Sequence, residues 1–414
     1  MLEKFKSFYN KEDLDYSKGY VDPFDFHQTF YKVKVPNLTR CNTIKKYVRK
    51  MISGKCPPRP LLTSISVYGG LEPFDLIHIT EAGTYTIILI YELLILYCTR
   101  KNKQQFHNLL RALKQDFHYI CTEGQKYRDQ YFEDQLKTWK ICIILCVFNA
   151  AVPIAMNIFA YASLFYFLAT QDNNTEESRP LLFPFSIPSV DFSKSPVYEV
   201  AFMFANITVM LYSYNYTFML QTQIVWIRQI ASKVDIVIWS LQDLLVDVYP
   251  TTNKEESEHF SSLIQSRMRD IIIHHQSMYS LMGDYAIVYK KLLLFEQAIG
   301  GPVVCLTAYC IAEKFDQGEF QAILLILCTT TVVLHFIPSL MCTYLSIKVQ
   351  SVCDTCSTMP FWNAGPELRS YMVLMMQRSL RPLPLRAPGF KDISVETFSQ
   401  DMTSAYSLFN MLRA

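Results

Sequence analysis

Long apolar runs alternate with charged segments over most of the chain. Five of the runs are long enough to cross a bilayer as helices, because a hydrocarbon core of about 30 Å takes about 20 residues. The five predicted spans are roughly 78–98, 139–169, 197–220, 292–312 and 320–347. A final helix, expected over about 394–412, is shorter and mixed in polarity. A helix of that kind belongs inside a protein assembly, because lipid alone cannot satisfy its polar groups.

The charges of the connecting loops predict the orientation. The loop 99–139 carries eight basic residues, whereas the loop 170–196 carries two. Since basic loops stay in the cytoplasm, the first loop is expected inside and the second outside. The Lys-rich N-terminus also favours the cytoplasm, which requires one more crossing before Leu71. Residues 41–70 show no such crossing in hydropathy, because they carry six basic residues and the helix-breaking "CPPRP". Charge therefore predicts seven spans, hydropathy alone predicts six, and we adopt seven.

The composition fits an integral membrane protein. Half of the residues are hydrophobic, the mean hydropathy is +0.12, and 18% are charged, against about 25% in soluble domains. The net charge of +2 gives no reason to expect nucleic acid as a partner. Twelve cysteines are scattered, many within apolar runs, and the single C-x-x-C pair, Cys353 and Cys356, has no second pair or neighbouring His. We therefore expect no metal, and no cofactor. No nucleophile–base arrangement or phosphate-binding loop is present, so we expect no enzyme.

The segment from Trp362 to the end carries a specific motif. A Trp is followed by a Met-containing helix, a basic residue, Arg-Pro-Leu, a Gly-Phe pair, and a tail with Ser-x-x-Ser spacing around a Tyr. The matching residues are Trp362, Met375, Arg378, Arg381, Pro382, Leu383, Leu385, Gly389, Phe390, Ser394, Phe398, Ser404, Tyr406, Ser407 and Leu412. This pattern resembles the closing segment of the insect odorant receptor family. The loop "PLLFPFSIPSVDFSKSPVYEVAF" is similar to the family's second outer loop.

The resemblance implies an all-α membrane protein of seven helices, with a cytoplasmic N-terminus and an extracellular C-terminus. It implies a tuning subunit of an odorant-gated, non-selective cation channel in the plasma membrane of a sensory dendrite. The implied partners are a shared coreceptor in a heterotetramer and a small volatile organic ligand. The loop 221–291 reads as helical extensions and is shorter than the coreceptor's loop, which favours a tuning subunit. The gustatory receptors end in Thr-Tyr-x5-Gln-Phe, and "SAYSLFNMLRA" lacks that Gln-Phe.

The resemblance implies that the last helix lines a central pore of the tetramer. Helical spacing places four residues on one face: Ser404, Ser407, Leu408 and Met411. Small hydroxyls beside apolar side chains suit a constriction that opens by wetting. The resemblance puts Met411 at the gate and a subunit anchor at Arg381, Pro382 and Leu385. The alternative is that this face packs against other helices.

The resemblance also divides the chain into four parts. Residues 1–70 are an N-terminal segment with a poorly defined first span. Residues 71–348 hold the ligand-binding helices two to six with cytoplasmic helical extensions. Residues 349–393 form an anchor helix and turn next to the cytoplasm, and residues 394–414 form the pore-lining helix.

A ligand site is expected at the outer ends of the spans. Asn149, Pro153, Asn157 and Tyr161 form an i, i+4 stripe on one span, and Phe202 and Asn206 repeat the spacing on the next. Polar groups at membrane depth usually face a bundle interior, where aromatic side chains and a few polar groups can bind a ligand. The resemblance adds Ile79, Gly83, Thr84 and Tyr309. The alternative is that the Asn side chains join helices by hydrogen bonds, each contributing about 0.6–2 kcal/mol.

Other polar residues carry less weight. Glu92 and Glu296 lie within apolar spans and could pair internally, and His274 and His275 lie in the helical loop. Of four sequons, only that of Asn173 falls in a predicted outer loop.

Two competing functions remain. A G-protein-coupled chemoreceptor would need the opposite orientation. A transporter should show internal repeats, whereas "EQAIGGP" (296–302) has no counterpart elsewhere.

Overall fold

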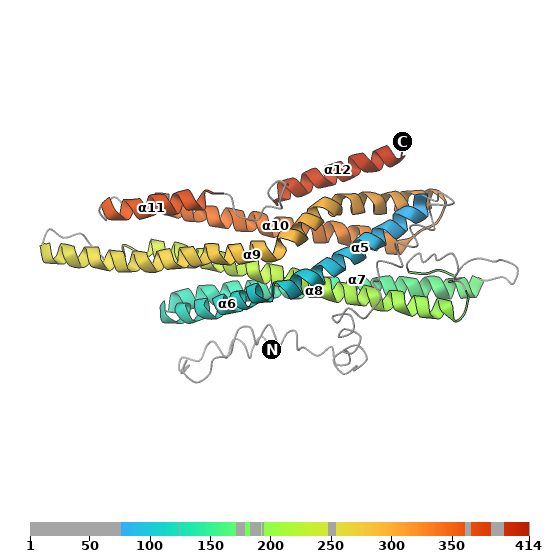
Figure 1. The fold of residues 1–414 in the computed structure, drawn as a ribbon, viewed down its shortest axis with the longest axis horizontal. Coiled ribbons are helices and arrows are strands. Elements are labelled where there is room, and N and C mark those ends of the chain that lie inside the picture. Colours follow the sequence, from blue (N-terminus) through green and yellow to red (C-terminus); the bar gives the residue numbers. More distant parts are fainter. Residues whose placement is uncertain are drawn as a thin grey trace, which may run out of the picture.

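The computed structural model describes residues 76–123, 125–170, 179–182, 192, 194–246, 254–360, 366–381 and 393–413. Eight helices form its regular structure (Figure 1): α5 (Leu76–Lys101), α6 (Lys103–Glu123), α7 (Gln125–Thr170), α8 (Val197–Gln242), α9 (Lys254–Asp316), α10 (Ala322–Thr358), α11 (Pro366–Ser379) and α12 (Val395–Arg413). The expected crossing before Leu71, the sequon at Asn173, and the anchor residues Pro382 and Leu385 lie outside the described residues.

Four of these helices, α5, α7, α9 and α10, are long and apolar enough to cross a membrane by length and composition. The fifth predicted span, 197–220, forms the first half of α8. With 46 residues in α7 and in α8 and 63 in α9, these helices far exceed the bilayer core of about 30 Å. Much of each helix therefore extends beyond its apolar part.

The extensions confirm that residues 221–291 are largely helical, since α8 continues to Gln242 and α9 begins at Lys254. The charged segment 99–139 is also helical, as α6 and the start of α7, rather than an open loop. Its length and its alternation of charged and apolar residues allow an amphipathic helix to pack along the bundle.

The extensions have a core of their own around Trp226. Its indole Nε1 donates a hydrogen bond to the Leu281 carbonyl (3.2 Å), and its ring packs edge-on against Tyr285 and Tyr289. All three side chains are fully buried. Because aromatic side chains bury 150–250 Å² each, this contact between α8 and α9 is a major source of stability.

A buried ion pair joins α6 to α8 beside that core. Lys233 Nζ lies 2.6 Å from Asp116 Oδ1 and donates a second hydrogen bond to Ser277 of α9, and Gln229 donates to the other Asp116 oxygen. Burial raises the pKa of the Asp116 carboxyl, while the Lys233 ammonium opposes that rise. The two charges are compensated inside the helix bundle, which is the condition for burying them.

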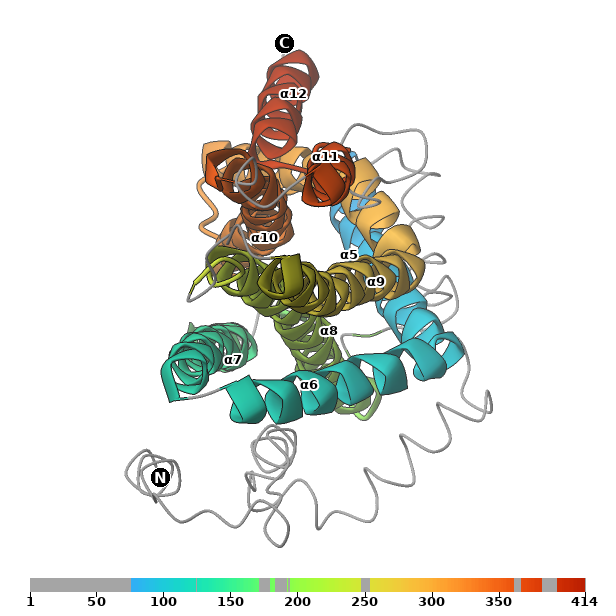
Figure 2. The ribbon, with the colours of Figure 1, turned by 90° about the vertical axis from the view of Figure 1, so that its left-hand side faces the viewer.

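The terminal helix confirms the predicted boundaries within one residue. Ser394 Oγ accepts a hydrogen bond from the Thr397 amide, and Thr397 Oγ1 accepts one from the Ser394 amide, which together cap the start of α12. The Val395 amide donates to Thr343 Oγ1 of α10 at 3.0 Å. α12 packs against α9 and α10 and lies on the side of the bundle away from α6 and α7 (Figure 2).

Candidate functional site

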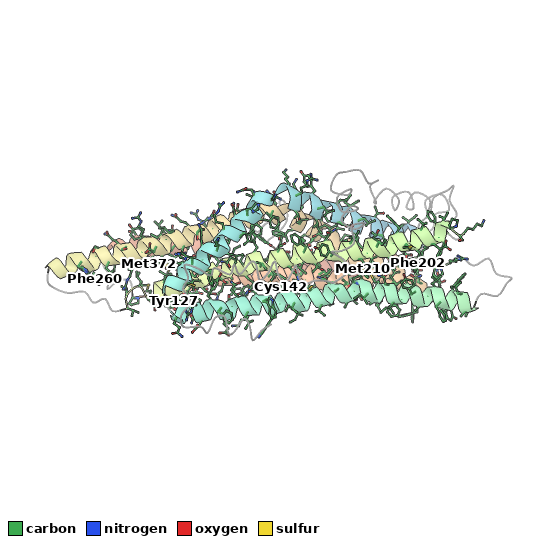
Figure 3. All side chains as sticks on the ribbon, turned by 90° about the horizontal axis from the view of Figure 1, so that it is seen from below. Tyr127, Cys142, Phe202, Met210, Phe260 and Met372 are labelled. Carbon is green, nitrogen blue, oxygen red and sulfur yellow. The ribbon has the colours of Figure 1, made fainter. Side chains whose placement is uncertain are left out.

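A cluster of buried apolar side chains joins α5, α7, α8 and α10. Its buried members are Tyr85, Met156, Ala160, Leu182, Tyr198, Phe202, Ala205 and Val209, with Ile323, Ile326 and Leu327 of α10 packed against them. We call it the Phe202 cluster. Figure 3 labels Phe202 near one end of the bundle and Phe260 near the opposite end. Trp226 belongs to a different cluster of buried side chains, against which Phe260 packs.

Phe202 is the aromatic centre of this cluster. Its ring is edge-on to Tyr161 (centroids 5.1 Å apart) and stacked on Tyr198 (5.8 Å). The Tyr198 hydroxyl donates a hydrogen bond to the Pro180 carbonyl at 2.9 Å, which fixes the ring. Two such ring pairs add about 0.5–1.5 kcal/mol each beyond area burial. They hold Phe202 in one orientation, as a shaped binding surface requires.

Asn206 lies one helical turn after Phe202, on the face that also carries Ala205 and Val209. Its side chain is 9% exposed, and neither Nδ2 nor Oδ1 has a hydrogen bond partner within the described part of the chain. A buried amide without partners costs about 1–3 kcal/mol. This residue therefore does not join helices, and it offers a donor and an acceptor to a bound molecule.

The two asparagines of α7 are used differently. Asn157 Nδ2 donates to the Pro153 carbonyl of its own helix at 2.6 Å. Pro153 has no amide hydrogen, so the Asn149 carbonyl loses its usual helical partner. Ser213 Oγ of α8 donates to that carbonyl at 2.5 Å and replaces the lost bond. The proline thus creates a link between α7 and α8, whereas Asn149 Nδ2 has no partner among the described residues.

The remaining predicted ligand residues lie outside the Phe202 cluster. Thr84 and Tyr309 are buried, and the Thr84 hydroxyl donates within its own helix to the Thr80 carbonyl (2.9 Å). A Cβ at Gly83 would have no neighbouring atom within 4 Å. Ile79 is partly buried, and Tyr161, although it touches Phe202, is 56% exposed. The structure therefore places Tyr161 against Phe202, and Asn206 one turn further along the same helix as Phe202.

Among the cluster members that sequence reasoning missed are its two tyrosines, Tyr85 and Tyr198, and Met156. Tyr198 precedes Phe202 by four residues, so the helical spacing that selected Asn206 would also have selected it. Tyr85 follows the predicted Thr84 directly. For Tyr85 and Met156 the missing information was the rotation of α5 and α7 about their axes.

Glu92 and Glu296, the two carboxylates within apolar spans, form hydrogen bonds inside the protein, which is one of the possibilities expected from the sequence. Glu296 Oε1 accepts hydrogen bonds from the hydroxyls of Tyr91 and Tyr216, and Glu92 Oε1 accepts one from Asn215 Nδ2 at 3.1 Å. These contacts tie α5, α8 and α9 together. The geometry thus gives both carboxylates a structural role in the bundle.

The predicted pore face of α12 is exposed in the described part of the chain. Leu408 is 41% exposed and Met411 67% exposed. The hydroxyls of Ser404 and Ser407 donate to carbonyls of their own helix, those of Gln400 and Thr403. Ala405 is the buried residue of the described helix. α12 therefore presents a mixed hydroxyl and apolar face that no other described segment covers.

Solved structures with a similar fold are insect receptors. The insect olfactory receptor OR5 from Machilis hrabei matches with a TM-score of 0.64 and 12% sequence identity, over 92% of each chain. The same receptor in complex with eugenol matches with a TM-score of 0.60 and 12% identity, over 90% of this chain and 91% of that one. At this identity the likeness concerns the fold. Among curated proteins none matches at a significant level.

The sequence itself matches a family profile across the described helices. The 7tm odorant receptor family matches residues 75–406, which include every described helix except the last turns of α12. The match covers most of the chain and agrees with the closing motif and with the fold. The chain belongs to the 7tm odorant receptor family.

Proposed function

We propose that this protein is the odorant-binding tuning subunit of a ligand-gated, non-selective cation channel, which opens on binding a small volatile organic molecule. The observation that carries the ligand proposal is Asn206, a buried amide without a described partner on the wall of an aromatic cluster. The OR5 receptor of similar fold has been solved with eugenol. Its complex supports a ligand of the same kind here.

The proposed ligand site lies on α7 and α8. Tyr161 and Phe202 supply aromatic surface, Asn206 supplies the polar contact, and Pro153 and Asn157 shape the facing helix. Ile79, Gly83 and Thr84 of α5 and Tyr309 of α9 are proposed as a second ligand-contacting surface, outside the Phe202 cluster. Affinity then comes mainly from apolar burial at about 25 cal/mol per Å². Since one methylene discriminates by about 1–3 kcal/mol, broad tuning is expected.

The proposed channel is a heterotetramer with a shared coreceptor in the plasma membrane. In it seven helices cross the membrane, the N-terminus is cytoplasmic, and the C-terminus is outside. Residues 394–414 line the central pore with Ser404, Ser407, Leu408 and Met411, and Arg381, Pro382 and Leu385 anchor subunits near the cytoplasm. The exposed face of α12 supports this assignment, because a mixed apolar face needs partner helices to cover it.

Recording of ion currents tests the proposal directly. The chain is expressed alone and with an insect coreceptor, and a panel of volatile compounds is applied. We expect odorant-evoked cation current only on coexpression. A robust G-protein response from the chain alone, without current on coexpression, would contradict the channel proposal and support a G-protein-coupled receptor.

Orientation is tested separately by glycan mapping. Glycan on Asn173 and none on Asn37 is the expected result, because the proposed topology puts Asn173 outside and Asn37 inside. The reverse result contradicts the topology.

A further inference from the structure

The "GGP" segment of α9 lies where three helices meet. A Cβ added at Gly300 would come within 2.7 Å of Nδ1 and 2.8 Å of Cε1 of His335, on α10. Contacts that short do not occur in proteins, so any larger residue would displace the imidazole ring. Pro302, two residues on, removes a helical hydrogen bond and loosens α9 locally. Gly300 is therefore the residue that allows His335 to lie against the α9 backbone.

His335, on α10, lies between the α9 backbone and the terminal helix α12. Its side chain is 4% exposed, and Nε2 lies 3.5 Å from Asp401 Oδ2 on α12. That distance is the outer limit for a hydrogen bond, and neither atom has another hydrogen bond partner in the described ranges. A small movement of α10 or α12 would either close this contact or lose it.

Two further contacts hold the same part of α12. The Phe398 ring lies 5.6 Å from the His335 ring and 5.2 Å from the Phe336 ring, measured between centroids. The Cβ position of Gly301 lies 3.4 Å from the Asp401 carbonyl oxygen, so α9 also touches the α12 backbone. One contact region, in which His335 is buried and the Asp401 side chain is 30% exposed, thus joins α9, α10 and α12 (Figure 1).

The same α10 carries the edge of the Phe202 cluster. Ile323, Ile326 and Leu327 pack against that cluster, and His335 follows Leu327 by two helical turns, about 12 Å along the axis. A packed helix moves as a body over such a distance, because interiors are dense and transmit displacement. A shift of α10 at the cluster therefore reaches His335.

We propose that Gly300, His335 and Asp401 form a joint that positions the terminal helix. Gly300 seats the imidazole, and His335 holds Asp401, so that a displacement of α10 by ligand is passed to α12. In the ligand-free state the contact restrains α12. The inference rests on the proposed function, in which α12 lines the pore.

The first set of variants tests the His335–Asp401 contact in the channel coexpressed with its coreceptor. His335→Ala and Asp401→Leu each should raise the ligand-free current by about two- to thirteen-fold at equal surface expression, the range that one ordinary hydrogen bond spans. The double variant should go no further, because both changes remove one interaction. Asp401→Asn keeps an acceptor oxygen and should stay near the wild-type level. An unchanged ligand-free current in both single variants overturns the joint and leaves the channel proposal standing.

The second set tests the seat provided by Gly300. Gly300→Ala should alter the ligand-free current and lower the melting midpoint of the purified protein. Gly300→Ala combined with His335→Ala should behave as His335→Ala alone, because the methyl group acts through the displaced ring. The matched control is Gly283→Ala on the same helix, whose added Cβ meets nothing within 4 Å. If the effect of Gly300→Ala persists without the His335 ring, α9 is sensitive for another reason and the seat is disproved.

Failure of the proposed function has a different signature. If the wild-type chain gives no current with any coreceptor, the channel proposal fails. The contact between Gly300 and His335 is then tested, without any measurement of current, by the melting midpoints of the same purified variants. Recovery of the Gly300→Ala midpoint by His335→Ala supports the contact, and additive losses overturn it.

Discussion

Replacement of Asn206 by leucine should make the receptor less selective for polar ligands. The substitution keeps a side chain of similar size and removes the two amide atoms that have no described partner. A ligand hydroxyl or carbonyl that pairs with the amide loses one hydrogen bond, worth about 0.5–1.5 kcal/mol net. This corresponds to a rise of about two- to thirteen-fold in the half-maximal concentration of such a ligand.

An apolar ligand of the same shape should respond differently. In the wild type it covers Asn206 without pairing it, so the amide stays unsatisfied at a cost of about 1–3 kcal/mol. That cost is largely present before binding, because Asn206 is already buried in the structure, with 9% of its surface exposed. The apolar ligand should therefore keep its potency or gain slightly in Asn206→Leu. We therefore predict that the potency of the polar ligand relative to that of the apolar ligand falls in Asn206→Leu.

The assay is a dose–response measurement of odorant-evoked current with a coreceptor present. Matched ligands, such as a para-alkylphenol and the corresponding alkylbenzene, are compared in wild type and variant. Asn157→Leu is the comparison variant, because Asn157 Nδ2 already donates to Pro153 and should discriminate the pair less. If Asn206→Leu shifts both ligands equally, or neither, Asn206 does not form a hydrogen bond with the polar ligand and the argument from its unpaired amide is refuted.

The remaining predictions concern other parts of the molecule. Phe202→Ala should raise the half-maximal concentration of polar and apolar ligands alike, because it removes shared aromatic surface; unchanged dose–response curves would disprove its role. Met411→Ser should raise basal current by easing wetting of the constriction, and Met411→Cys should become sensitive to an aqueous thiol reagent only while odorant is present. Should Met411 variants change odorant sensitivity alone, with basal current and cation permeability intact, α12 is not the pore. Lys233→Met should destabilise the protein by about 3–5 kcal/mol, seen as a lower melting midpoint, because it leaves the buried Asp116 carboxylate without its cation. Adding Asp116→Leu should restore much of that loss, and a further drop would contradict the pairing.

The sequence by itself determined the five apolar helical spans, the terminal helix and the family, but not the helix α6. Apolar length and helical spacing are local properties, so the spans and the terminal helix could be placed without knowledge of packing. The closing motif from Trp362 onward identified the family for the same reason, since its residues and spacing are read directly along the chain. The i, i+4 spacing of Phe202 and Asn206 also selected two residues that are both buried on one face of α8.

Tertiary structure alone decided how the helix faces meet. Asn157 and Asn206 looked equivalent in the sequence, yet one is paired within its helix and the other is buried without a described partner. Tyr85 joined the cluster, Gly300 met His335, and His335 met Asp401, through contacts between helices distant in the chain. Such contacts depend on the rotation and tilt of each helix, which follow from packing of all its neighbours together. No local pattern encodes them, because the same spacing suits a face turned toward lipid, toward a ligand or toward another helix.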